Sequence, residues 1–218
     1  MTAAPAARSP RPVSRWRHEP FRLFFPLGVL LAWVGIGHWL LYATGMIATY
    51  SCLLHGLVQM EAFMMAFAVG FLLTALPRRT QSPPPTRLEV TLAAAALATI
   101  TIAACAGDWA LAQVAYAGVL LLLLRFAVRR LRGREAGRRP PAAFVLLPIA
   151  ALHGLLGAAL IVAGLRPHAP PWCLGLGRLC VEQGVFLCLV IGVGALLLPL
   201  IAGTRAPADL GTSPREAA

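Results

Sequence analysis

Apolar residues gather in six runs, and each run is long enough to cross a bilayer as a helix, since about 20 residues span the hydrocarbon core. Prolines, glycines and arginines separate the runs, and these residues end helices or resist the bilayer. The pattern predicts an all-α fold, a polytopic membrane helix bundle of about six transmembrane helices. The predicted helices cover approximately residues 24–42, 51–76, 88–106, 109–128, 143–165 and 179–202.

The rest of the chain completes the expected organisation. Residues 1–23 are rich in proline and arginine and are expected to form a disordered cytoplasmic tail, residues 24–202 the transmembrane domain, and residues 203–218 a second disordered tail. The composition agrees, because 59% of the residues are hydrophobic and only 12% are charged. This composition excludes a soluble globular domain.

The net charge of +11 would suit nucleic-acid binding if the basic residues shared one soluble face. All nineteen are arginines, and only Arg166 and Arg178 fall in the segment between the fifth and sixth helices; the others lie in the tails and in loops on the opposite side. The positive-inside rule therefore predicts that both termini are cytoplasmic. The charge indicates topology rather than a nucleic-acid partner, and the densest run, Arg125 to Arg139, is expected to contact anionic lipid.

The second predicted helix carries three polar residues within its apolar run, namely His55, Gln59 and Glu61. An ionisable group inside a span costs roughly 2.5 to 3.5 kcal/mol, so these side chains should face other helices. At 100° per residue, His55 and Gln59 share a stripe with Gly70, whereas Glu61 lies about 120° away from His55. The helix is therefore expected to be central and to turn polar groups toward more than one neighbour.

Other ionisable residues are His38, expected in the outer half of the first helix, His153, near the middle of the fifth, and Glu182, near the outer end of the sixth. They are expected to converge with His55 and Glu61 in the periplasmic half of the bundle. Imidazoles from facing helices commonly hold haem iron or copper, so His55, His153 and His38 are candidate cofactor ligands, with His55 and His153 the candidates for direct metal binding. His38 also fits an interfacial role. Glu61 and Glu182 fit either a proton relay or neutral hydrogen-bonded packing.

Two weaker signals remain open. Met60, Met64 and Met65 suit either cuprous copper, as soft ligands, or ordinary core packing. An internal echo links the second and sixth helices at an offset of 124 residues, and indicates either a parallel repeat or a chance match between leucine-rich helices. The echo pairs Gln59, Val69-Gly70 and Leu72-Leu73 with Gln183, Val193-Gly194 and Leu196-Leu197.

Two segments, Glu19-Pro20-Phe21-Arg22-Leu23-Phe24-Phe25 and Ala68-Val69-Gly70-Phe71-Leu72-Leu73-Thr74-Ala75-Leu76-Pro77, resemble the NnrS family of bacterial multi-pass membrane proteins. The resemblance implies a haem- and copper-containing protein linked to nitric oxide and nitrosative stress, in the bacterial inner membrane. His55 falls on the first histidine of the family's W-H-x-H-E-M motif. The second histidine and the glutamate fall on Leu57 and Val58, so the paired ligand signature is absent.

Three classes of function follow. The first is an NnrS-like protein that binds haem or copper and acts in the response to nitric oxide or respiratory stress. The second is a small proton-coupled transporter that uses Glu61, Glu182 and His153. The third is a non-catalytic assembly or regulatory subunit, which the absent second histidine favours. No motif in the sequence identifies a reaction.

Overall fold

The structure is a computed structural model that describes residues 18–133 and 142–203. Within these ranges every regular element is a helix, and six helical spans are long and apolar enough to cross a membrane, which confirms the predicted fold class. The predicted tails and the later part of the arginine run fall largely on residues 1–17, 134–141 and 204–218, outside the described residues. The elements are α2 (Phe21–Ala43), α3 (Cys52–Leu57), η1 (Val58–Met64), α4 (Met65–Thr80), α5 (Arg87–Cys105), α6 (Trp109–Arg132), η2 (Ala142–Val145), α7 (Leu146–Gly164), α8 (Pro171–Leu179), η3 (Cys180–Val185) and α9 (Phe186–Ile201).

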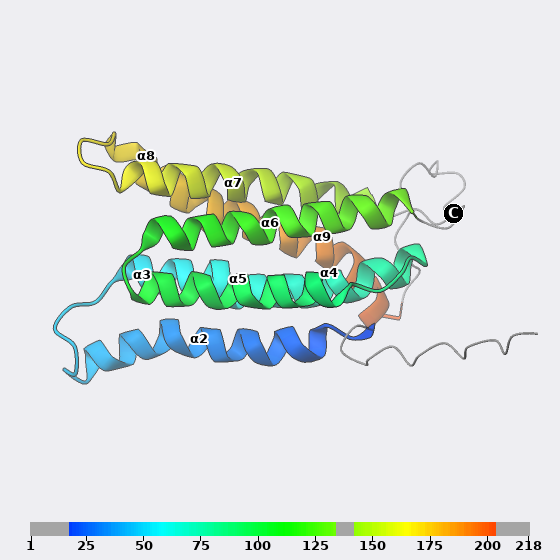
Figure 1. Cartoon of the computed structure of the whole chain (residues 1–218), viewed down its shortest axis with the longest axis horizontal. Helices are drawn as coiled ribbons and strands as arrows, with labels where there is room; N and C mark the ends of the chain where they lie inside the picture. Colours follow the sequence, from blue (N-terminus) through cyan, green and yellow to red (C-terminus); the bar gives the residue numbers. More distant parts are fainter. Residues whose placement is uncertain (1–17, 134–141, 204–218) are drawn as a thin grey trace, which may run out of the picture.

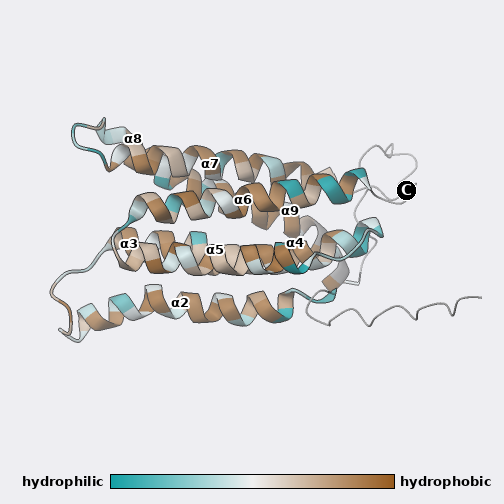
Figure 2. Ribbon diagram, in the orientation of Figure 1, coloured by the Kyte–Doolittle hydropathy of each residue, from teal (hydrophilic) through white to brown (hydrophobic). Residues whose placement is uncertain are grey.

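The six spans run up and down, side by side, and the described chain starts and finishes at the same end of the bundle (Figure 1). We call this the basic end, because the arginine-rich last turns of α4 and α6 lie there. The opposite end, which we call the far end, holds the connections after α2, α5 and α7. Hydrophobic residues follow the helices along most of their length, as Figure 2 shows.

The second span, made of α3, η1 and α4, is the central helix of the bundle. Its most apolar stretch is 56% buried, against 28% for α2. It packs against α2, α5 and α6, and the side chains of Leu57, Val58, Met65 and Leu73 are at most 1% exposed. The expectation of a central second helix is confirmed.

Several helix ends differ from the predicted ones. The second span continues through Pro77 to Thr80, because proline in the last turn forfeits only its own N–H bond. The sixth span begins at Pro171, eight residues before its predicted start, because the fixed φ of proline suits a first helical position. The fourth span extends to Arg132, so the first half of the arginine run is helix rather than loop.

Glycines bring the fifth and sixth spans into backbone contact. A Cβ atom on Gly157 would lie 2.8 Å from the carbonyl oxygen of Gly177, and one on Gly177 would lie 2.9 Å from the carbonyl oxygen of Gly157. Either atom would clash, so the close approach needs small residues, as is common between membrane helices. This contact fixes the start of the sixth span against α7.

Both the second and the sixth spans contain a π-helical segment, η1 and η3. The two segments lie in contact with each other. They carry the polar residues that the sequence singled out, Gln59 and Glu61 in η1 and Glu182 and Gln183 in η3. Because π segments within α-helices are frequent at functional sites, this pair marks the region where a site should be sought.

Candidate functional site

His55 and Gln59 both face α2. The Nδ1 atom of His55 lies 3.1 Å from the carbonyl oxygen of Gly35, and Nε2 of Gln59 donates to the carbonyl oxygen of Ala32 over 3.0 Å. The predicted polar stripe is therefore real and points at the first span. A carbonyl oxygen only accepts, so Nδ1 of His55 carries the ring proton and Nε2 keeps its lone pair.

His38 has the opposite arrangement at the same end of the bundle. Its Nε2 atom accepts the backbone N–H of Ser51 over 2.9 Å, so the lone pair on Nε2 is already used. The ring of Tyr50 lies between the two histidines, 5.4 Å from the His38 ring and 6.3 Å from the His55 ring. The structure thus brings His38 and His55 into one aromatic cluster, but leaves only His55 with a free Nε2 lone pair within that cluster.

His153 belongs to a different contact, between α7 and η3. Its Nδ1 atom lies 2.9 Å from the carbonyl oxygen of Ile149, and its ring packs over Gly184, where a Cβ atom would lie 2.7 Å from the ring. In the described part of the chain, no three His, Cys, Asp or Glu residues group closely enough to hold a metal ion. The predicted role of the three histidines as ligands stays a prediction.

Glu61 faces α6, away from the two histidines of the aromatic cluster. Its side chain is 0% exposed, and Nε2 of Gln113 lies 2.9 Å from each of its carboxyl oxygens. Gln113 is 2% exposed, and its Oε1 atom has no hydrogen-bond partner among the described residues. Tyr116, one turn later on α6, is fully buried, and its hydroxyl lies over Gly154.

The low polar content of the fourth helix indicates a packing role, so Gln113 and Tyr116 are not predicted as site residues. Both lie in a helix of low polarity, and a lone glutamine in such a helix usually packs or bonds to a backbone carbonyl. Depth in the membrane is the signal that could have found them, because Glu61 and Gln113 lie at similar depths on two helices that both run from the far end to the basic end.

Glu182 faces the second span as well, but it is already paired. Nε of Arg178, one turn earlier, donates to its Oε1 atom over 2.8 Å, and the pair lies over Gly56, where a Cβ atom would come within 2.8 Å of that oxygen. No hydrogen bond joins Glu182 to Glu61 or to His153 in the described ranges. Instead of one cluster, the polar groups form four separate contacts around η1 and η3.

A second buried carboxylate, Glu89, lies at the basic end. Arg130 donates to both of its oxygens at 3.0 Å, is 6% exposed, and stacks 4.0 Å from the Phe126 ring centre. Glu89 also accepts the backbone N–H of Thr86 over 2.7 Å, which caps α5. Arg130 therefore departs from the expectation for the arginine run, because it pairs with a carboxylate inside the bundle instead of reaching lipid.

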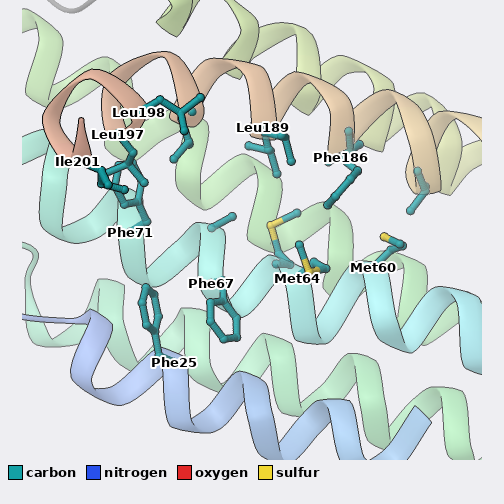
Figure 3. Close-up of a pocket in the computed structure, with 17 residues that line it drawn as sticks. Phe25, Met60, Met64, Phe67, Phe71, Phe186, Leu189, Leu197, Leu198 and Ile201 are labelled. Carbon is teal, nitrogen blue, oxygen red and sulfur yellow. The ribbon is translucent and has the colours of Figure 1, made fainter. Parts of the chain in front are cut away.

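An apolar groove of about 390 Å³ separates the basic-end halves of the second and sixth spans (Figure 3). Figure 3 shows Met60 and Met64 at its wall with aromatic side chains from three spans, Phe25, Phe67 and Phe186. None of the residues that line it is a histidine or a carboxylate. The methionines thus meet apolar neighbours, as they do in ordinary packing.

Comparison of the sequence with models of known protein families identifies the family of this helix bundle. The model of the family described as NnrS protein matches residues 15–216, nearly the whole chain. The chain belongs to the NnrS family. No curated protein and no solved structure matches it. The resemblance seen in the sequence is therefore confirmed, and the six spans make this NnrS protein a multi-pass membrane protein.

Proposed function

We propose that this NnrS protein acts in the bacterial inner membrane in the response to nitric oxide or respiratory stress, and that it binds haem through His55. The observation that carries the proposal is the ring orientation of His55. An imidazole that ligates a metal usually donates its other N–H to a carbonyl or carboxylate, which is how His55 donates to Gly35. The family supplies the nitric oxide context.

The described residues fit an axial haem ligand better than a copper centre. Copper commonly takes three or more protein ligands, and no such group is present in the ranges that the structure describes. A haem iron needs one or two axial ligands and could offer a diatomic gas an open position. His153 is the second candidate, because its Nδ1 is also turned to a carbonyl, and His38 is the third, because its Nε2 is occupied.

The test is a reduced-minus-oxidised absorbance spectrum with metal analysis on full-length protein, purified in detergent from cells supplied with haem. We expect a Soret band that His55→Ala removes and the matched variant His38→Ala keeps. A folded wild-type protein that is colourless would overturn the proposal. A band that survives His55→Ala but is lost in His153→Ala would move the ligand to the fifth span.

A proton-coupled carrier is the second candidate, favoured by the burial of Glu61 without a cationic partner. In this alternative Glu61 takes up and releases protons on a path that includes His153 and Glu182. Proteoliposomes that contain Glu61→Gln should then lose proton flux. Flux equal to that of the wild type would reject the carrier.

We also propose that anionic lipid contacts the Arg125–Arg139 run, through the exposed arginines in the part of the run that is helical. Arg125, Arg129 and Arg132 are exposed on α6, whereas Arg130 is turned inward. Mass spectrometry of copurified lipid should show less phosphatidylglycerol with Arg125→Gln and Arg132→Gln combined. An unchanged lipid content would contradict this contact.

A further inference from the structure

Glu61 differs from the other buried or half-buried carboxylates described above in having no cationic partner. Glu89 is paired with Arg130 and Glu182 with Arg178, whereas the contacts described for Glu61 are with the neutral amide of Gln113. A bare carboxylate in an apolar interior costs several kcal/mol or more. The site must therefore be able to neutralise this charge.

The titratable groups on the elements around Glu61 do not supply a free cation at this position. Tyr116 on α6 is neutral at ordinary pH. Glu182, on η3, is an acid already paired with Arg178. The other histidines, arginines and glutamates are bonded elsewhere, exposed or at the basic end: His38, His55, Arg22, Arg78, Arg79, Arg87, Glu89, Arg125, Arg129, Arg130 and Arg132.

The amide of Gln113 can serve either protonation state of a carboxyl group. Its Nε2 atom now faces both oxygens of Glu61, and its buried Oε1 atom has no partner in the described part of the chain. A carboxylate accepts from the amide nitrogen, whereas a carboxylic acid donates its O–H to the amide oxygen. Rotation of the amide by half a turn exchanges these two atoms with little change in shape.

We propose that Glu61 and Gln113 form a proton-binding site in the membrane interior. A proton from water adds to one carboxyl oxygen of Glu61, and the new O–H bond donates to Oε1 of Gln113 once the amide has rotated. Release of the proton to water reverses both changes and returns Nε2 to the carboxylate. The site binds a proton whether or not the protein transports protons or holds haem. The proposal can therefore be tested separately from the functions proposed above.

A proton suits this position better than a metal cation. Metal cations that prefer oxygen commonly take six or more ligands, whereas the side chains at this position provide a carboxyl, one amide and one phenol. Glu61, Gln113 and Tyr116 do not line the apolar groove. A proton on Glu61 needs only one hydrogen-bond acceptor. Oε1 of Gln113 is a buried acceptor that receives no hydrogen bond from the described residues.

The test is infrared difference spectroscopy of the full-length protein in lipid nanodiscs at neutral pH. We expect a carbonyl stretch of a protonated carboxylic acid, with an amplitude of one group per molecule, that disappears in Glu61→Gln. In Gln113→Leu the band should remain and move to higher frequency, because the acid loses its hydrogen-bond partner. Glu182→Gln, the matched control, should leave the band unchanged, because Glu182 is bonded to Arg178 and no hydrogen bond joins it to Glu61 or Gln113 among the described residues.

A spectrum without a Glu61-dependent acid band at neutral or mildly acidic pH would overturn the proposal. So would a band that keeps its frequency in Gln113→Leu, since that result would remove Gln113 from the site. If Glu61→Gln does not fold, carbon NMR of wild-type protein labelled at the glutamate carboxyl carbons replaces it, and Gln113→Leu then assigns the resonance. Finding all glutamates ionised by that measurement would reject the site as well.

Discussion

Glu61 and Glu89 are both at most 4% exposed, yet they meet different partners. Glu89 has a bidentate guanidinium and also caps the helix that carries it, whereas the contacts found for Glu61 are with a single neutral amide. The first arrangement compensates the charge and joins two helices. The second offers an ionised Glu61 no compensating charge. Burial of an acid in a membrane bundle therefore does not itself indicate function. The partner of the acid decides whether it joins helices, as Glu89 does, or is free to bind a proton, as proposed for Glu61.

The largest expected effect is from breaking the compensated pair. Arg130→Ala leaves the buried Glu89 carboxylate with the exposed Arg129, 4.0 Å away, in place of its bidentate partner, which should lower the free energy of unfolding by about 3 to 5 kcal/mol. Thermal unfolding in detergent measures this loss. The double variant Glu89→Leu with Arg130→Leu should lose less than Arg130→Ala, because no buried charge remains; an equal or larger loss would show that packing, and not charge, dominates at this position.

A smaller loss of stability is expected from removing the hydrogen-bond partner of Glu61. Gln113→Leu should cost about 1 to 3 kcal/mol, the usual cost of leaving a neutral buried polar group unpaired. A charged Glu61 would instead cost as much as Arg130→Ala. Measuring both variants under the same conditions therefore reports which charge state Glu61 holds, and equal losses would count against the proton site.

The isosteric change Glu61→Gln should alter stability by less than about 1 kcal/mol. The new amide can still pair with the amide of Gln113, and a neutral group replaces a neutral acid of almost the same shape. Thermal unfolding checks this as well. A loss above about 3 kcal/mol would mean that the carboxylate form holds the helices together.

The smallest effect is expected at an exposed pair. Glu19, near the start of α2, lies beside Arg22 and Arg78, whose side chains are 60% and 59% exposed. Solvent screens such pairs, so Glu19→Gln should cost at most about 1 kcal/mol, and added salt should reduce even that. A loss comparable to that of Arg130→Ala would show that this end of the bundle is less exposed to solvent than the structure indicates.

The sequence predicts most of the architecture and part of the site. Apolar runs gave all six spans, and helical periodicity correctly placed His55 and Gln59 on one face with Glu61 on another. These features depend on local spacing along one helix, which a sequence displays directly.

The hydrogen-bond partners of Glu61 and Glu89 could not be predicted from the sequence, because they depend on the relative rotation and height of different helices. Gln113 looked like packing, and Arg130 looked like one more arginine for lipid, until α6 was placed against η1 and α5. The start of the sixth span was missed because Pro170-Pro171 indicates a loop as readily as a helix start. Whether the echo between the second and sixth spans is a repeat stays a prediction, although both contain a π segment.

The π segment in the second span also has a consequence for how this helix tolerates change. A π turn holds one more residue than an α turn, so it behaves as a phase shift of about 100° between the stretches on either side of it. Removing a single residue from Val58–Met64 should therefore restore a continuous α-helix and leave the faces of α3 and α4 in step, because the lost residue accounts for the same 100°. His55 would then still face Gly35 while Gly70 kept its contact with α2, so the span should tolerate the loss of one residue at this place and at no α-helical turn on either side of it.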